Sequence, residues 1–313
     1  MNHDAIRVLI AVVSYNKRHD TLRCLDSIKK LAFMSYDVFV VDNASTDGTP
    51  EEIRRRLPEV QLVETGGNLG ASAARNIAIE YALKADYKYI LFLDNDAFVD
   101  ELCLQKLVDF AETDERIGAV GAKVFYYPEV SKIWYFGAKI DWKKGAFVDT
   151  CQGEIDDGRF EAIREVDTFP IGFGLVRIEA VLKAGKIDED YFIYYEETDW
   201  QLRIKKFGYK VFVIPTAKIW HHYTSPAGNA SRAFYYYRNR NQLLFMYKNS
   251  PKRYWLGFLA RFVLQFTYSI ALTLYLSKKN CELRAAISGV FDFFLGRWGK
   301  KVLTSKVVNE SRN

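Results

Sequence analysis

The apolar run from Tyr89 to Leu93 most narrows the possible fold, because it stops abruptly at the triplet Asp94-Asn95-Asp96. A short apolar run bounded by polar residues is typical of a buried strand, and open α/β sheets bind ligands beyond the carboxyl ends of such strands. Carboxylates at i and i+2 of extended backbone point the same way and can bind a hard divalent cation. A simple Asp/Asn turn is also compatible with these residues, so the triplet alone leaves both interpretations open.

Three earlier runs repeat this pattern of apolar residues followed by a polar loop and a helical segment. They are Ile6 to Val13, which only Arg7 interrupts, Asp37 to Val41, and Val60 to Val63. Because strands of this kind alternate with helices, the sequence predicts a right-handed, mostly parallel α/β sheet. Helix starts are expected at Asp20-Thr21 and Thr49-Pro50. The other expected helices are 71–83, 101–112 and 199–207, and the other expected strands are 117–124 and 210–214.

The totals fit a globular protein with one large or two smaller domains: 313 residues, of which 49% are hydrophobic and 27% charged. Four scattered cysteines without C-x-x-C spacing argue against a disulfide framework or a zinc site and fit a reducing cytosol. The segment Met1 to Asp4 has no leading basic region, so no signal peptide is expected.

Charge is divided unevenly along the chain. Residues 226–313 contain fifteen Lys/Arg and three Asp/Glu, which gives +12, and the remaining 29 Lys/Arg and 36 Asp/Glu give residues 1–225 a charge of −7. A basic tail on an acidic body indicates an anionic partner. We expect this partner to be a membrane surface and not a nucleic acid.

The middle of this tail, Tyr254 to Leu276, is strongly apolar, although Arg261 interrupts it. Its uncharged part, 262–277, has 16 residues, fewer than the ~18–20 that span a bilayer. Polar residues recur every four positions from Arg261 to Thr273 and would form a narrow stripe on a helix. This pattern suits a helix in a membrane interface, and the alternative is a helix packed on the rest of the protein with its basic side chains reaching water.

Polar residues follow each of the first four predicted strands, and parallel strands end at the same edge of a sheet. Asp42, after the second strand, is placed to accept hydrogen bonds from a ribose or a base. Gly70 begins a helix whose N-terminus favours a phosphate, and Arg75 adds a charge one turn later. The absence of G-x-G-x-x-G and P-loop motifs disfavours a dinucleotide fold or an NTPase. The residues expected at this edge are Ser14, Asn16, Asp42, Asn68, Gly70, Arg75, Asp94 and Asn95.

Four segments together resemble the nucleotide-sugar half of family 2 glycosyltransferases, namely VVSYN, VDNASTDGT, NLGASAARN and LDND. The resemblance continues through FPIGFGLVR, IDEDYFIYYEETDWQLRIKKFGYKV and AKIWHHYTS, so that it covers roughly residues 6 to 225. YYYRNRNQLLF and ISGVFDFFLGRWGK in the tail are similar to the ends of bacterial rhamnosyltransferase-like polysaccharide glycosyltransferases.

The resemblance implies an α/β fold of the GT-A class, a Rossmann-like, mostly parallel sheet followed by a helical, basic, apolar extension. The implied boundaries are a catalytic domain at 1–225, with a nucleotide-sugar half at 1–100 and an acceptor half at 101–225, and the extension at 226–313. We expect a cytoplasmic protein, peripheral at the cytoplasmic face of the cell membrane.

For the metal and the donor, the resemblance implies specific positions. Asp96 and Asp94 form the D-x-D pair, with Asp96 the more direct ligand of Mg²⁺ or Mn²⁺, and His221 matches a histidine that completes the metal site in some relatives. Asp42 would meet the nucleobase, and Asn68 and Arg75 would lie along the donor.

For catalysis, the resemblance implies that Glu197 in YYEETDW is the base, although the family usually has Asp there. Glu196 and Asp199 are the alternative candidates for the base. These acidic residues are also compatible with a helix N-terminus that has no catalytic role, because the helix dipole favours negative charge there. Arg203 lies one turn beyond Asp199 and is expected to pair with it. The residues expected to support the acceptor or the site are Trp200, Arg203 and Gly172.

The expected reaction is inverting, metal-dependent transfer of a hexosyl or deoxyhexosyl group in cell-envelope polysaccharide synthesis. The donor would be a UDP-, dTDP- or GDP-linked sugar and the acceptor a saccharide, expected to be lipid-linked. A metal would absorb charge on the leaving diphosphate and a carboxylate would take the proton of the attacking hydroxyl. Two alternatives remain, a non-catalytic sugar-nucleotide- or glycan-binding protein on the same fold and a sugar nucleotidyltransferase.

Overall fold

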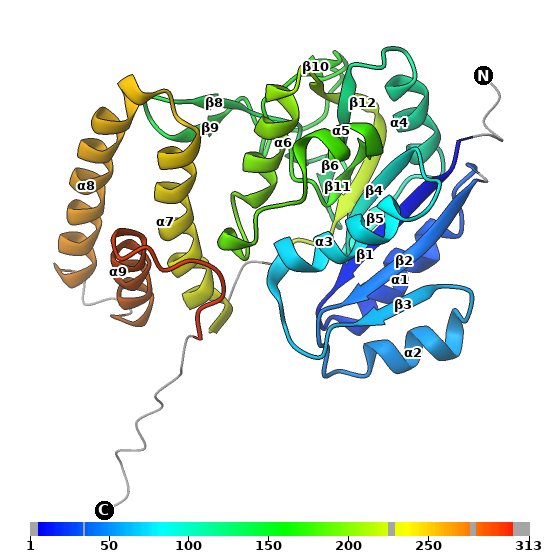
Figure 1. Ribbon diagram of the computed structural model, residues 1–313, viewed down its shortest axis with the longest axis horizontal. Helices are drawn as coiled ribbons and strands as arrows, with labels where there is room; N and C mark the ends of the chain where they lie inside the picture. Colours follow the sequence, from blue (N-terminus) through cyan, green and yellow to red (C-terminus); the bar gives the residue numbers. More distant parts are fainter. Residues whose placement is uncertain (1–5, 34, 225–228, 276–279, 303–313) are drawn as a thin grey trace, which may run out of the picture. The chain divides into compact units, whose positions relative to one another are not determined.

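The computed structural model describes residues 6–33, 35–224, 229–275 and 280–302, and it divides into two compact units (Figure 1). The α/β unit comprises Met1–Asp141, Ala146–Glu189 and Glu196–Tyr223, and the helical unit comprises Trp142–Gly145, Asp190–Tyr195 and Thr224–Asn313. The main segment of the helical unit thus begins close to the boundary expected after residue 225. Its two short segments were not expected from the sequence.

The α/β unit is built on a ten-stranded sheet with β11 and β4 at the middle of its main path. Its main path runs β10-β12-β6-β11-β4-β1-β2-β3, with β5 paired to β12 and β7 to β6. The strands β3, β2, β1 and β4 are parallel, β11 is antiparallel to both β4 and β6, and β12 is parallel to β6. The short strands β5, β7 and β10 are antiparallel to their partners. The mostly parallel sheet predicted from the sequence is confirmed. The strands are β1 (Val8–Ser14), β2 (Tyr36–Asp42), β3 (Gln61–Glu64), β4 (Tyr89–Asp94), β5 (Ala97–Val99), β6 (Ile117–Tyr126), β7 (Ile133–Tyr135), β10 (Arg164–Glu165), β11 (Phe173–Arg177) and β12 (Lys210–His221), and β8 (Lys139–Asp141) pairs with β9 (Ala146–Val148) in a separate small sheet.

Helices cover both faces of the large sheet, which explains why its central strands are continuously apolar. Alternate residues of β4 enter two different cores: Leu91 and Leu93 pack on one side, Ile90 and Phe92 on the other. One core includes residues of α1, α2 and α4, and the second includes residues of α3, α5 and α6. The helices are α1 (Arg18–Ile28), α2 (Thr49–Arg56), α3 (Gly70–Leu83), α4 (Cys103–Ala111), α5 (Ile178–Ala184) and α6 (Glu196–Lys206).

Two element boundaries differ from the prediction in ways that matter for the site. α6 begins at Glu196 and not at Asp199, so both glutamates lie in its first turn, where the helix dipole favours negative charge. β12 continues past Ile214 to His221, because its second half pairs with β6 and β5. Smaller differences are that α1 begins at Arg18 and that Gly48, with φ 81°, precedes α2 as its N-cap.

The helical unit contains α7 (Asn229–Asn249), α8 (Lys252–Tyr275) and α9 (Asn280–Phe294), coloured yellow to red in Figure 1. α7 and α9 pack closely, since a Cβ on Gly289 would overlap the carbonyl oxygen of Tyr236. Tyr236 Oη also donates to Asp292 Oδ2 at 2.7 Å. The buried Asn241 Nδ2 donates to the carbonyls of Tyr191, Ile193 and Tyr194, which fixes the segment preceding Glu196.

Most of the apolar surface of α8 is not buried within the helical unit. Among the described residues it is the one helix long and apolar enough to cross a membrane, and only 11% of that stretch, Lys252–Leu272, is buried. A core helix of a soluble protein passes the same test but is mostly buried. Lys278 and Lys279, expected to flank this helix, lie outside the described residues, as do Met1 to Asp4.

Candidate active site

The predicted loops meet at the carboxyl edge of the sheet because their strands are direct neighbours. Ser14 pairs with Asp42 and Val13 with Asp94, so the segments after β1, β2 and β4 leave the sheet side by side. Ser14 itself is buried against Thr21, with their hydroxyl oxygens 3.3 Å apart. This edge is where parallel sheets place ligands.

Asn16 ties the three loops together. Its Oδ1 accepts from the backbone N–H of Thr46 at 2.9 Å, and its own N–H donates to Ser45 Oγ at 2.7 Å. Asn95 Nδ2 donates to the carbonyl of Asn16 at 3.0 Å. Asn16 and Lys17 both have left-handed backbone, at φ 57° and 58°, a conformation that non-glycine residues keep only where surrounding contacts enforce it.

Asp42 is fully buried, and its carboxylate accepts from the N–H and the Oγ of Ser45 at 2.8 and 2.6 Å. In this conformation it holds its own loop. The next residue, Asn43, was not predicted as a site residue. Its Nδ2 lies 3.2 Å from Asn68 Oδ1, and its Oδ1 accepts from Leu69 N–H at 2.8 Å. Its only signal was a position directly after a strand end.

Asn68 and Gly70 define the start of α3. Asn68 Oδ1 accepts from the N–H of Gly70 at 2.9 Å, and Asn43 Nδ2 reaches the carbonyl of Gly70 at 3.3 Å. The tight turn before α3 is therefore fixed from both sides. It places the helix N-terminus, with its partial positive charge, at the edge that carries Asp42.

Arg75 lies buried among three carboxylates. Its Nη2 donates to Asp94 Oδ1 and its Nη1 to Glu196 Oε1, both at 2.9 Å, and Glu197 Oε2 is 4.0 Å from Nη1. Burial opposes the charge of Arg75, but the carboxylates, Asp94 first, raise its pKa above the ordinary value. Arg75 thus links the D-x-D segment to α6, a connection between residues 121 positions apart that the sequence did not reveal.

Glu197 is the carboxylate of this cluster that combines partial exposure with a perturbed pKa. A quarter of its side-chain surface is exposed, whereas Glu196 is 3% exposed. Its Oε2 accepts from the backbone N–H of Ile171 at 2.9 Å. Burial, followed by the charge of Glu196, raises the pKa of Glu197 to about 8. A carboxylate with these properties is suited to accept a proton near neutral pH.

Asp199, Trp200 and Arg203 attach α6 to the neighbouring backbone. Asp199 is buried, and its Oδ2 accepts from Arg203 Nε at 3.0 Å. Arg203 Nη1 also donates to the carbonyl of Ala184 at 2.7 Å, and the fully buried Trp200 donates through Nε1 to Gly185 at 2.7 Å. The expected pairing of Asp199 with Arg203 is present, and these contacts favour Glu197 over Asp199 as the reacting carboxylate.

Gly172 leaves the space that the Asp94 side chain fills. A Cβ at this position would overlap the carboxylate of Asp94, and the Gly172 carbonyl accepts from Asp94 N–H at 3.1 Å. Gly172, which the sequence predicts to support the acceptor or the site, is therefore in direct contact with Asp94.

We expect Gly172→Ala to reduce activity by about 10-fold or more and to lower stability by about 1–3 kcal/mol, the usual cost of overpacking. The added methyl forces Asp94 away from Arg75. Steady-state kinetics and urea unfolding measure the two effects. Gly67→Ala is the control, because a Cβ there meets no atom within 4 Å. Equal kinetics for both variants would contradict the role given to Gly172.

Asp96 and His221 lie together because β12 pairs with β5, which sets His221 opposite Ala97. Asp96 Oδ1 is 3.2 Å from His221 Nε2, and Asp96 Oδ2 accepts from Lys17 Nζ at 2.9 Å. Although burial opposes it, His221 and Lys17 lower the pKa of Asp96 to about 2. Lys17 was not predicted as a site residue, and its position after the braced Asn16 is the only sequence signal.

Of the three predicted metal ligands, Asp96 and His221 lie close together and Asp94 does not join them. Among the described residues no group of three or more His, Cys, Asp or Glu forms a metal-ligand cluster, because Asp94 turns to Arg75. Asp96 and His221 do face one another. One carboxylate and one imidazole fit a divalent ion whose remaining ligands are substrate oxygens and water.

Two family models match the chain, glycosyl transferase family 2 over residues 9–166 and glycosyl transferase family group 2 over residues 89–294. The chain belongs to glycosyl transferase family 2. The family resemblance read from the sequence is therefore confirmed, and this family 2 protein is a nucleotide-sugar glycosyltransferase.

Two relatives of this family 2 glycosyltransferase are named as rhamnosyltransferases. An N-acetylglucosaminyl-diphospho-decaprenol L-rhamnosyltransferase of Mycobacterium tuberculosis is 27% identical over 240 residues, covering 70% of this chain and 77% of the relative. The dTDP-rhamnosyl transferase RfbF of Shigella flexneri is 26% identical over 258 residues, covering 77% and 80%.

The fold of this glycosyltransferase matches solved structures at low sequence identity. The mannosyltransferase PcManGT of Pyrobaculum calidifontis, in complex with GDP-Man and Mn²⁺, has a TM-score of 0.57 and 18% identity, with 93% of this chain and 88% of that chain covered. The predicted GT-A fold with a C-terminal helical extension is thereby confirmed.

Proposed function

We propose that this glycosyltransferase transfers a deoxyhexosyl group, with inversion, from a nucleoside-diphosphate sugar to a lipid-linked saccharide in envelope polysaccharide synthesis. The observation that carries the proposal is the partly exposed Glu197, whose pKa is raised to about 8. It lies in one ion-pair cluster with Asp94 through Arg75. The names of the two rhamnosyltransferase relatives support the sugar class, and the diphospho-decaprenol in one of them supports the acceptor class.

In this mechanism Glu197 takes the proton of the acceptor hydroxyl as its oxygen attacks the anomeric carbon. The bond from that carbon to the diphosphate oxygen breaks, and the nucleoside diphosphate leaves. One base and one displacement give inversion, and no second nucleophile is needed. The Ile171 N–H orients the Glu197 carboxylate, and Arg75 holds Asp94 and Glu196 in place.

Asp96 and His221 would hold a divalent metal, Mg²⁺ or Mn²⁺. When bound, the metal supplies charge stabilisation for the leaving diphosphate. Asn16 and Asn95, both expected on the nucleotide side, make their hydrogen bonds within the protein. Asn16 accepts from the backbone of Thr46, and Asn95 donates to the Asn16 carbonyl and to the Thr21 hydroxyl.

The test combines thermal shift with product analysis. We expect one of the UDP-, dTDP- or GDP-linked sugars to raise the melting temperature, and more so with Mn²⁺ present. Release of a nucleoside diphosphate on turnover supports the proposal. Release of pyrophosphate would instead indicate a nucleotidyltransferase, and binding without any turnover would indicate a sugar-nucleotide-binding protein.

We also propose that α8 brings the enzyme to the cytoplasmic membrane face. Its exposed apolar side chains include Leu256, Leu264 and Tyr268, and the net charge of +12 in residues 226–313 favours anionic lipid.

We expect the full chain to float with anionic liposomes and the double variant Leu264→Glu/Tyr268→Glu to float at least about 10-fold less, because two charges enter the apolar surface. Sucrose-gradient flotation measures this. The control Leu182→Glu changes an exposed leucine of the α/β unit. Equal flotation of the double variant and the wild type would remove the membrane assignment.

A further inference from the structure

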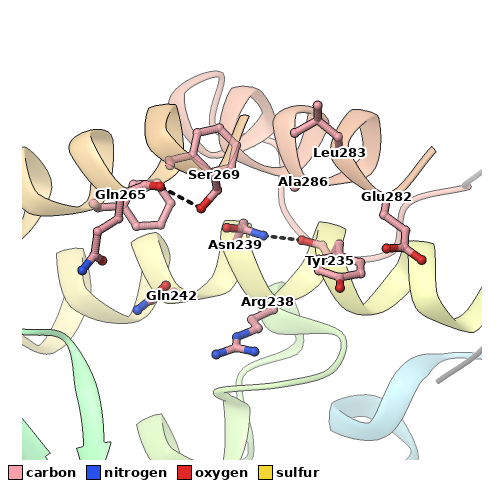
Figure 2. Close-up of a pocket in the computed structure, with 11 residues that line it drawn as sticks. Tyr235, Arg238, Asn239, Gln242, Gln265, Ser269, Glu282, Leu283 and Ala286 are labelled. Atoms are coloured by element: carbon pink, nitrogen blue, oxygen red, sulfur yellow. Dashed lines mark hydrogen bonds between the residues drawn. The ribbon is translucent and has the colours of Figure 1, made fainter. Parts of the chain in front are cut away.

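A groove lies within the helical unit, bordered by α7, α8 and α9. Its volume is about 700 Å³, which is within the range of small-ligand sites. Figure 2 shows side chains from all three helices around it, with Gln265 and Ser269 on α8 and Leu283 and Ala286 on α9. None of its lining residues belongs to the candidate active site.

The lining is amphiphilic. Phe262 and Phe266 of α8 and Leu283 and Ala286 of α9 give it an apolar wall, on which rings and aliphatic groups can pack against a hydrocarbon chain. The α7 side is polar and contributes Arg238, Asn239 and Gln242. A ligand that fits both walls carries an apolar chain and a polar or anionic group.

Charge favours an anionic group on the α7 side. Among the described residues Arg238 forms no ion pair, and its ring contact is with Phe234, 5.4 Å from the ring centroid. In Figure 2 its side chain leaves α7 on the side away from α9, so the guanidinium is separate from the apolar wall that α8 and α9 form. The carboxylate of Glu282 lies on α9 and disfavours an anion on that side.

The groove lies next to exposed apolar side chains of α8. Val263, Leu264 and Tyr268 on α8 are exposed, and only 11% of the apolar stretch of this helix is buried. A lipid chain held at a bilayer surface therefore reaches the groove along α8 without crossing water.

We propose that this groove binds the isoprenoid chain of a lipid diphosphate, with the diphosphate on the α7 side near Arg238, and so holds the lipid part of the acceptor. This inference rests on the proposed function, because it assigns the groove to the lipid part of the proposed acceptor.

The test uses the full chain and a diazirine-bearing farnesyl diphosphate as the photo-crosslinking probe, with labelled peptides located by mass spectrometry. We expect labelling on α8 and α9 peptides. Ser269→Trp should reduce it at least 10-fold, because Ser269 is exposed and lines the groove, so the indole fills it without disturbing a core.

Thr267→Trp is the matched control. Thr267 lies on the same helix, is exposed, and does not line the groove, and its hydroxyl donates to the carbonyl four residues earlier, as that of Ser269 does. We expect its labelling to equal that of the wild type. Equal loss in both variants, or no loss in either, would overturn the inference.

Competition with farnesol and with pyrophosphate distinguishes binding of the apolar chain from binding of the diphosphate. Unlabelled farnesyl diphosphate should compete with the probe at least 10-fold better than farnesol or pyrophosphate, and Arg238→Gln should remove the advantage over farnesol only. Competition by pyrophosphate alone at equal concentration would show that the groove does not bind the chain.

Kinetics distinguish failure of this inference from failure of the proposed function. In Ser269→Trp we expect the KM for a polyprenyl-diphosphate-linked saccharide to rise about 10-fold, with the KM for the nucleotide sugar unchanged. Transfer that is normal for both substrates would reject the groove and leave the glycosyl transfer intact. Absence of any nucleotide-sugar turnover in the wild type would reject the proposed function, while the labelling result would still decide whether the groove binds the lipid.

Discussion

Glu197→Gln is expected to lower the rate of transfer by about 10²–10⁴-fold, the usual effect of removing a general base. Glutamine keeps the length of the side chain and can still accept the Ile171 N–H, so the fold should persist. It cannot take the proton of the acceptor hydroxyl. Initial rates at saturating donor and acceptor measure the loss, and circular dichroism verifies the fold.

The pH profile provides a further measurement on the same group. Glu197 acts as a base only when deprotonated, and its pKa is raised to about 8. kcat/KM should therefore rise as the pH increases through about 8 in the wild type. Glu196→Gln removes the neighbouring charge, which is the second cause of the raised pKa after burial, and should move this limb to lower pH. Because the two glutamates interact, the limb reports the pair.

A Glu197→Gln enzyme with normal turnover would reject the assignment of the base. A limb that stays at the same pH in Glu196→Gln would show that another group controls it. Asp199 would then be the group to examine next, although its pairing with Arg203 disfavours it.

Asp96→Ala is expected to reduce transfer by about 10³-fold or more, since the loss of metal-assisted charge stabilisation is worth several kcal/mol. The same variant should lose the Mn²⁺-dependent increase in melting temperature seen with the nucleotide sugar. Asp96 is the carboxylate that faces His221, whereas Asp94 is paired with Arg75. The metal response therefore tests the assignment separately from turnover.

The chain offers a matched control for this variant in a second aspartate–histidine pair. Asp20 Oδ1 is 2.9 Å from His222 Nδ1, and His222 follows His221 directly. Asp20→Ala should keep both turnover and the Mn²⁺ response within about 3-fold of the wild type. If Asp96→Ala retained its Mn²⁺ response, or if both variants lost it equally, Asp96 would not be the ligand.

The sequence alone determined the alternation of the first four strands with helices and the sheet edge at which the predicted site residues meet. Continuous apolar runs such as Tyr89 to Leu93 must be covered on both faces, so they become central strands of a helix-covered sheet. Polar residues directly after such strands must then meet at one edge. Asp94 and Asp96 were predicted as site residues in this way, and Glu197 and His221 were predicted through the motifs that surround them.

Only the tertiary structure decided how these groups pair. Asp94 and Asp96 are two residues apart, yet one joins Arg75 and Glu196 and the other joins Lys17 and His221. The same holds for the groove, whose walls come from three helices. Strand and helix formation follow local periodicity, which sequence displays. Ion pairs and cavities depend on which distant side chains the packed elements bring within a few ångströms, and no local pattern records that distance.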